Sequence, residues 1–237
     1  MILKITGDTH RDTKRILEYI DLHNKGVKFD MLMVCGDFGF VLTGSKEENL
    51  FLDFIEKEAN FEIVFVDGNH ENFPEIYSYP IEIWNGGKVH RIRRNIRHLM
   101  RGEIYNINGK TFFTFGGGYS IDKIRRLKYQ EEHKQAIWWK EEFPSKEEID
   151  NAFTNLESHN WTVDYIVTHS APSSILPFVS EFFISNLKAD IDIVNTTLEQ
   201  IKEKTTFSHW FFGHYHGEKD FLDKYSLLYF TSKNLTL

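Results

Sequence analysis

The sequence predicts an α/β fold with parallel strands at its centre. Short apolar runs of strand length alternate with helical patterns through the first half of the chain. Most of these runs are followed at once by Gly or by a polar turn residue. Strands that alternate with helices form a sheet covered by helices, and ligands bind at the carboxyl ends of such strands. We therefore expect the functional residues to follow the predicted strands directly.

Six runs are predicted to be buried strands because they are short, apolar and bounded by turn residues. They are Ile2–Thr6, Met31–Cys35, Ile63–Asp67, Thr111–Phe115, Tyr165–Thr168 and Trp210–Phe212. Cys35, in the second run, is expected to be a small buried core residue and not a nucleophile.

Four segments carry helical spacing of apolar residues or a helix start signal. One runs from Asp12 to about Asn24, two open on the capping boxes Ser45-x-x-Glu48 and Ser145-x-x-Glu148, and one runs from about Asp190 to Lys204. These helices are expected to cover the faces of the sheet.

The composition indicates one globular domain that spans residues 1–237. The chain is 41% hydrophobic and holds 21 Phe, so a large aromatic core is expected. A single Cys excludes an intramolecular disulfide and a thiolate metal cage, which leaves the eleven His and the carboxylates as candidate metal ligands. The net charge of −7 argues against a protein that coats nucleic acid.

The N-terminus, MILKITGDTH, becomes polar too early for a signal peptide. No apolar run approaches the roughly 20 residues that a membrane span needs. A cytoplasmic location without a membrane partner is therefore expected, and the oligomeric state stays open.

Residues of the kind that bind metals follow five of the predicted strands. The segments are Gly7-Asp8-Thr9-His10, Gly36-Asp37, Gly68-Asn69-His70-Glu71, His169 and Gly213-His214-Tyr215-His216. In Asp-x-His and His-x-His, both side chains lie on the same side of an extended chain. Imidazole and carboxylate without thiolate suit Mn, Fe, Zn, Co or Ni. Two Asp, one Asn and four His suffice for two ions that share a bridging carboxylate.

Each segment alone has an ordinary explanation, because Gly-Asp is a common turn signal and His-x-His is more often structural. All five in this order, each next to an apolar run, make chance the weaker explanation. The series GDTH, GD, GNHE, TH, GHYH resembles the signature of the calcineurin-like metallophosphoesterases, from Gly7 to His216. The resemblance implies a four-layer α/β/β/α sandwich with a dinuclear metal centre between the sheets.

The resemblance also implies a role for each residue. The first metal ion would be held by Asp8, His10 and His216, and the second by Asn69, His169 and His214, with Asp37 bridging. His70 would be the catalytic histidine, which protonates the leaving group and is not a ligand. The expected reaction is hydrolysis of a small phosphomonoester or phosphodiester by a hydroxide that bridges two divalent ions, with Mn²⁺ as the favoured metal.

The segment after Asp37 departs from the family pattern. Relatives that share the GNHE form carry Asp-Arg-Gly soon after the second motif, whereas Phe38-Gly39-Phe40-Val41 stands here. The carboxylate partner of the catalytic histidine and a phosphate-binding arginine are thus absent at that place. This weakens a protein-phosphatase interpretation and leaves the orientation of His70 unexplained. Arg11 stands where many members have Gly, and it either reaches the substrate or points into solvent.

A glycine segment follows the fourth predicted strand. Its backbone N–H groups could approach an anion, which makes Gly117, Gly118, Tyr119 and Lys123 candidate substrate-binding residues. A surface turn followed by a solvated helix is the alternative. The block resembles one in small bacterial and phage-type metallophosphoesterases.

Two other functions stay open beside the favoured small-molecule phosphoesterase. A nuclease of the same family would use the arginine-rich segments, although the arginines between 91 and 101 are better explained as a strand pair with a charged outer face. A non-catalytic protein-binding scaffold on the same fold would have no need for His70.

Overall fold

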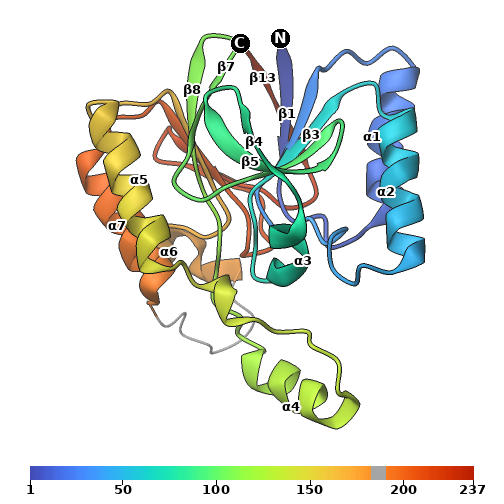
Figure 1. The fold of residues 1–237 in the computed structure, drawn as a ribbon. Coiled ribbons are helices and arrows are strands. Elements are labelled where there is room, and N and C mark those ends of the chain that lie inside the picture. Colours follow the sequence, from blue (N-terminus) through green and yellow to red (C-terminus); the bar gives the residue numbers. More distant parts are fainter. Residues whose placement is uncertain (183–190) are drawn as a thin grey trace.

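The structure, a computed structural model, describes residues 1–182 and 191–237. Two mixed β-sheets lie face to face in these residues, and helices cover the outer face of each sheet (Figure 1). The predicted α/β class and the four-layer α/β/β/α order are therefore confirmed.

The first sheet runs in the order β13–β1–β2–β3–β6–β5–β4 within the described chain. Its central strands β1, β2, β3 and β6 are parallel, and antiparallel pairs form at both edges. The bounds are β1 Ile2–Thr6, β2 Met31–Val34, β3 Glu62–Phe65, β4 Ile81–Trp84, β5 Gly87–Arg93, β6 Ile96–Leu99 and β13 Ser232–Thr236.

The second sheet runs in the order β11–β12–β10–β9–β8–β7, again within the described residues. Strands β12, β10, β9 and β8 are parallel, and β11 and β7 pair antiparallel at the edges. The bounds are β7 Ile104–Ile107, β8 Lys110–Phe115, β9 Tyr165–Thr168, β10 His209–Phe212, β11 Lys219–Phe221 and β12 Tyr225–Leu227.

The helices divide between the two outer layers (Figure 1). α1 and α2 pack on the first sheet, α5 and α7 pack on the second, and α4 extends away from both. The bounds are α1 Thr13–Asn24, α2 Lys46–Glu58, α3 Phe73–Ser78, α4 Lys123–His133, α5 Lys146–Ser158, α6 Leu176–Val179 and α7 Ile193–Lys204. No helix in the described part of the chain combines the length and apolar character that a membrane crossing requires.

Alternation along the strands builds three apolar cores. In β10, Phe211 points into the core between the sheets, whereas Trp210 and Phe212 point toward the helices on the outer face. Because successive strand side chains point to opposite faces, a run that is apolar at every position fills two cores at once. Cys35 is fully buried in the inter-sheet core, as predicted, and burial raises the pKa of its thiol.

The predicted helix starts are found with two differences. Ser145 and Glu148 form a complete capping box at α5. At α2, Ser45 accepts the expected N–H of Glu48, but the Glu48 carboxylate accepts N–H groups from the preceding loop instead of closing the box. α7 begins after the cap Asp192, and the start predicted at about residue 190 lies outside the described residues.

Candidate metal centre

Five parallel strands from the two sheets deliver the predicted ligands to one end of the molecule. The loops after β1, β2 and β3 of the first sheet meet the loops after β9 and β10 of the second, away from both chain termini (Figure 1). The residues on these loops are Asp8, His10, Asp37, Asn69, His70, His169, His214 and His216. The sequence-based expectation that carboxyl ends of strands position the site therefore holds for the whole set.

The first group of side chains is formed by Asp8, His10 and His216. Nε2 of His10 lies 2.9 Å from Nε2 of His216, and the latter lies 3.2 Å from Oδ2 of Asp8. Nε2 of His10 is 3.7 Å from the same carboxylate oxygen. Three donor atoms of the kinds that bind transition metals thus converge.

The second group is formed by Asp8, Asp37 and His169. Nδ1 of His169 lies 2.8 Å from the carbonyl oxygen of Cys35, so it carries the proton and donates it there. Nε2 of His169 is then the ring nitrogen that can bind a metal, and it lies 3.6 Å from Oδ1 of Asp37 and 3.0 Å from Oδ1 of Asn69. A backbone carbonyl that fixes the tautomer is the usual companion of a metal-binding histidine.

The amide orientation of Asn69 is fixed by Ser120. The Ser120 hydroxyl donates its one hydrogen to the buried Glu142 carboxylate, so it must accept the bond from Nδ2 of Asn69 at 3.1 Å. The amide oxygen of Asn69 then faces the Nε2 lone pair of His169. When the His169 ring is neutral, these two acceptors, 3.0 Å apart, repel each other unless a cation binds to both, which fits a metal site.

His214 belongs to neither group, although it lies beside the second one. Its ring centroid is 4.8 Å from that of His169, and its backbone N–H donates to Oδ1 of Asp8 at 3.0 Å. Burial and the neighbouring His169 lower the pKa of His214 to about 3. The imidazole is therefore neutral near pH 7, which is the form that binds metals.

Both carboxylates are ionised. Burial alone would raise the pKa of Asp8 and of Asp37, but neighbouring imidazoles outweigh it and lower both values. For Asp8 the hydrogen bond from His216 is the largest of these effects, and for Asp37 the nearby His169 is. Two buried carboxylates beside several imidazole nitrogens form a site for cations.

Two glycines allow the carboxylates to lie against the neighbouring loops. An ideal Cβ on Gly213 would lie 2.1 Å from Oδ1 of Asp8, and one on Gly68 would lie 2.0 Å from Oδ1 of Asp37. No other residue fits at these two positions without displacing a carboxylate. This explains why the segments read Gly-Asn-His and Gly-His-Tyr-His.

Hydrogen bonds between loops hold Asp37 in place. Its carbonyl oxygen accepts the N–H of His10 at 2.8 Å, and its Oδ1 accepts the N–H of His70 at 2.8 Å. The buried Glu71 carboxylate accepts the N–H of Phe38 at 2.7 Å. The Glu of the Gly-Asn-His-Glu segment therefore anchors the loop that carries Asp37.

The backbone at this end of the molecule is strained. His10, Arg11, Asp37, His214 and His216 all have positive φ, between 45° and 69°. Such conformations cost on the order of 1–3 kcal/mol for each residue and are found mainly at functional sites.

A comparison with family models agrees with this arrangement. The model of the calcineurin-like phosphoesterases matches residues 1–218. The chain belongs to the calcineurin-like phosphoesterase family. No curated protein matches the chain. Members of this family are hydrolytic phosphoesterases that typically bind divalent metals, and the two groups of Asp and His side chains agree with metal binding.

His70 differs in its surroundings from the pattern expected of the calcineurin-like family. No carboxylate of the described residues forms an ion pair with its ring, in keeping with the missing Asp-Arg-Gly segment. The ring lies edge-on to that of His10, with centroids 5.3 Å apart, and its backbone N–H is bonded to Asp37. Packing and the backbone therefore orient His70, and burial lowers its pKa.

The glycine segment around Gly117 and Gly118 packs closely against the candidate metal centre. The N–H of Gly117 donates to the carbonyl oxygen of Asp67 at 2.9 Å, and that of Gly118 donates to the carbonyl oxygen of Glu142 at 3.2 Å. These two N–H groups are therefore not free to bind an anion. An ideal Cβ on Gly118 would lie only 3.1 Å from the His169 ring, so the segment can approach the centre because it lacks side chains.

The other candidate substrate residues have partners of their own. Nη1 of Arg11 lies 3.6 Å from the Glu48 carboxylate. Nζ of Lys123 lies 4.1 Å from the centroid of the Trp138 ring, and Tyr119 is half-buried. Their contact with substrate stays a prediction.

The arginine-rich segment is the predicted strand pair, β5 with β6, but its charged face is only partly on the outside. Arg101 is buried, and its Nε donates to Oδ2 of Asp67 at 2.9 Å. Nε2 of His98 lies 3.0 Å from the other oxygen of the same carboxylate. The prediction of an outward charge was thus wrong for Arg101, because an arginine on a strand end looks the same in sequence whether it is solvated or paired.

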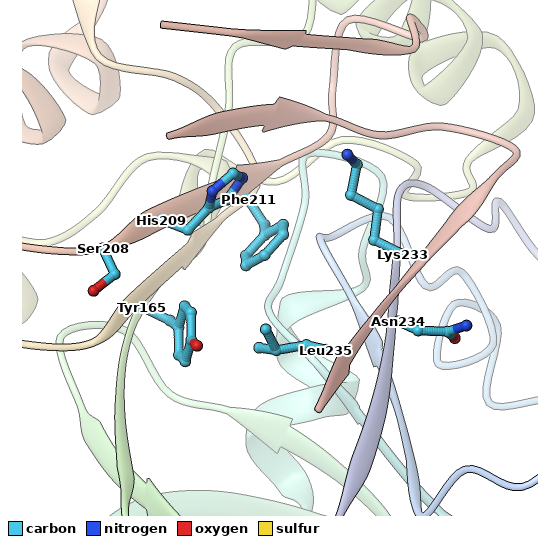
Figure 2. A pocket seen from close by; sticks show the side chains of 7 residues that line it. All are labelled: Tyr165, Ser208, His209, Phe211, Lys233, Asn234 and Leu235. Carbon is cyan, nitrogen blue, oxygen red and sulfur yellow. The ribbon is translucent and has the colours of Figure 1, made fainter. Parts of the chain in front are cut away.

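His209 lies apart from the centre although it is close to the last motif in sequence. It stands at the amino end of β10, and its Nε2 lies 2.8 Å from the Ser226 hydroxyl. Figure 2 shows its ring in a hollow that is also lined by Tyr165, Lys233 and Leu235. The strand separates this hollow from the histidines at its carboxyl end.

Proposed function

We propose that this calcineurin-like chain is a metal-dependent phosphoesterase that hydrolyses a small phosphomonoester or phosphodiester. The observation that supports this most strongly is the close approach of Nε2 of His169 and Oδ1 of Asn69, 3.0 Å apart, next to the ionised Asp8 and Asp37. Atoms that repel one another in a buried site become favourable once divalent cations bind there.

The ligand assignment is part of the proposal. Asp8, His10 and His216 would hold one ion, Asn69, His169 and His214 would hold the other, and Asp37 would be shared between them. Mn²⁺ is the favoured metal, and Fe, Zn, Co or Ni would suit the same mixture of imidazole and carboxylate. Two such ions supply Lewis acidity to a phosphoryl oxygen and lower the pKa of a water.

The protein side chains would do the rest of the chemistry. Asp8 and Asp37 offset only part of the positive charge of two ions, so the site attracts an anionic phosphate although the chain carries −7 overall. His70, in its protonated form, would give its proton to the departing oxygen of the ester as the ester bond breaks. Burial lowers the pKa of His70, so its protonated form is a stronger acid toward the departing oxygen and makes up a smaller share of the protein near neutral pH.

The test combines metal reconstitution with two simple esters. Hydrolysis of p-nitrophenyl phosphate and of its bis-ester is measured with Mn²⁺ and the other metals, for the wild type and for His70→Asn. We expect metal-dependent hydrolysis that falls by about 10²–10⁴-fold in His70→Asn with metal content unchanged. His209→Asn is the matched control and should keep wild-type activity. A wild-type protein that hydrolyses neither ester with any of the metals would contradict the proposal.

Two arms of the same experiment separate the alternatives. Cleavage of single- or double-stranded DNA at a rate far above that of the simple esters would identify a nuclease. A metal-loaded chain that hydrolyses none of these substrates, and that keeps a physiological role in His70→Asn, would be a binding scaffold.

A further inference from the structure

Arg126 links the α4 helix to the candidate metal centre by hydrogen bonds. α4 extends away from both sheets (Figure 1), and Arg126 is its buried residue, with an exposed fraction of 6%. The side chain of the preceding residue, Arg125, is 82% exposed, and the apolar Ile124 is 85% exposed. The helix therefore contributes a cation, and not an apolar face, to the body of the protein.

Arg126 reaches the loop that carries Asn69 and His70. Its Nη1 donates to the carbonyl oxygen of Asn69 at 3.1 Å and to the Ser120 hydroxyl at 3.0 Å. The guanidinium thus lies against the peptide that joins a proposed metal ligand to the proposed proton donor. It is also close enough to Asp37 and His70 to interact with both electrostatically.

The positive charge of Arg126 has no direct counter-ion. No carboxylate oxygen of the described residues lies within 4.0 Å of its guanidinium nitrogens. Buried arginines are normally paired, as Arg101 is with Asp67. Arg15 also lacks a carboxylate partner, but both of its terminal nitrogens donate to oxygen atoms around it.

The donors of Arg126 are only partly used. Its Nε and Nη2 groups have no hydrogen-bond partner in the part of the chain that the structure describes, and neither is sealed from solvent. Burial lowers the pKa of this guanidinium, although the more distant carboxylates of Asp122, Glu142 and Asp37 oppose the shift. A bound oxyanion would neutralise the charge of Arg126 and accept hydrogen bonds from its Nε and Nη2. The planar guanidinium of arginine matches a phosphate group in this way.

We infer that Arg126 binds a phosphoryl oxygen of the substrate through Nε and Nη2, so that α4 supplies the arginine that is missing after Asp37. The inference rests on the proposed phosphoesterase function. It assigns to α4 a direct part in substrate binding, although the helix lies outside the four layers of the fold.

The test compares Arg126→Ala and Arg126→Lys with Arg125→Ala, a matched change one residue away on the same helix. Two quantities are measured on the Mn²⁺-loaded proteins: the inhibition constant of inorganic phosphate against p-nitrophenyl phosphate, and the rise in melting temperature that inorganic phosphate produces. Bound Mn²⁺ is counted in each protein.

We expect Arg126→Ala to weaken phosphate inhibition by about tenfold to hundredfold and to abolish most of the phosphate-dependent rise in melting temperature. Arg126→Lys should recover part of both effects, because it keeps the charge and loses the fork. Arg125→Ala should stay within about twofold of the wild type, and all variants should bind the same amount of Mn²⁺.

Two results would overturn the inference. One is phosphate inhibition in both Arg126 variants that matches Arg125→Ala. The other is a loss of Mn²⁺ binding that accounts for the whole effect, because it would reduce Arg126 to a support for Asn69. A wild type without activity toward any ester is a different failure, which concerns the phosphoesterase function. The phosphate-dependent melting temperature still tests Arg126 in that case.

Discussion

At the residue scale, the candidate centre depends on close approach between a backbone and a carboxylate. Gly213 and Gly68 lie where any side chain would collide with Asp8 or Asp37. These carboxylates also accept N–H bonds from His214, which follows Gly213, and from His70, which comes two residues after Gly68. The geometry of the ligands is thus set by peptides as much as by side chains.

Gly213→Ala should therefore impair metal binding. Its Cβ would lie 2.1 Å from Oδ1 of Asp8, which must move and take its bond to His214 with it. We expect Mn²⁺ affinity to fall by about 10–100-fold, the range found when partners that orient ligands are lost. Titration calorimetry measures this directly.

Gly26→Ala is the control for this change. Gly26 has a φ of 95° with open space around it, so alanine there should lower the stability of the fold by about 1 kcal/mol and leave Mn²⁺ affinity unchanged. Equal Mn²⁺ affinity in Gly213→Ala and the wild type would show that Asp8 does not hold a metal in this geometry.

The metal-type residues could be predicted from sequence because each follows an apolar run at the end of a strand. Arg126, Ser120 and Glu142 could not be predicted in the same way. Arg126 stands in a basic helix, where a buried arginine and a solvated one look alike in sequence. Ser120 and Glu142 are far apart along the chain and meet only in the folded protein.

At the element scale, a buried network ties the first sheet to the glycine segment. Asp67, just after β3, accepts hydrogen bonds from Arg101 and pairs with His98 of β6. Its carbonyl oxygen accepts the N–H of Gly117. Asp67 thus joins two strands to the segment that packs against the His169 ring.

Asp67→Asn should lower the stability of the protein and make that stability less dependent on pH in the acidic range. Removal of the carboxylate leaves the buried Arg101 with the partly exposed Glu148 as its acidic partner among the described residues, so the expected cost lies toward the lower end of about 3–5 kcal/mol. Burial alone would raise the pKa of Asp67, but Arg101 and His98 hold it well below its usual value. A depressed carboxyl pKa contributes stability above the unfolded value of about 3.9, and this stability is lost as the pH falls below it.

Urea unfolding at pH 7 and at pH 3 checks this prediction. The wild type should lose more stability than Asp67→Asn between the two pH values. Asp150→Asn, which changes an exposed residue of a surface ion pair, should behave like the wild type at both. A wild type and Asp67→Asn with parallel pH dependence would contradict the role given to the network.

The strands predicted from sequence lie inside the sheets and are mostly apolar, and the edge strands show why others were missed. In β4, Ile81 and Ile83 are more than half exposed, and β13 is mostly polar. Edge strands are held by backbone pairing to a neighbour, and their side chains carry little of the apolar pattern. β2 also ends one residue earlier than predicted, because Cys35 leads into Gly36 at a φ of 91°.

At the scale of the whole molecule, the candidate ligands come from both sheets. Asp8, His10, Asp37 and Asn69 follow strands of the first sheet, whereas His169, His214 and His216 follow strands of the second. Ions bound among them would join the two sheets at the end where the apolar core between them stops. Metal binding should therefore stabilise the fold as well as serve the chemistry.

Mn²⁺ should raise the melting temperature of the chelator-treated protein. At a free concentration about 100 times the dissociation constant, a ligand that binds only the folded state adds about 2.7 kcal/mol for each site. For a chain of this length that corresponds to about 5–10 °C. Asp37→Asn should lose most of the rise because it faces both groups of ligands. A rise of the same size in Asp37→Asn would place the stabilising ion elsewhere.

We propose that two divalent ions bind among the residues gathered at the carboxyl ends of β1, β2, β3, β9 and β10. Anomalous diffraction from crystals grown with Mn²⁺ can locate them. We expect two peaks, one among Asp8, His10 and His216 and one among Asn69, His169 and His214, with Asp37 between them. A map at saturating Mn²⁺ with no peak among these residues would contradict it.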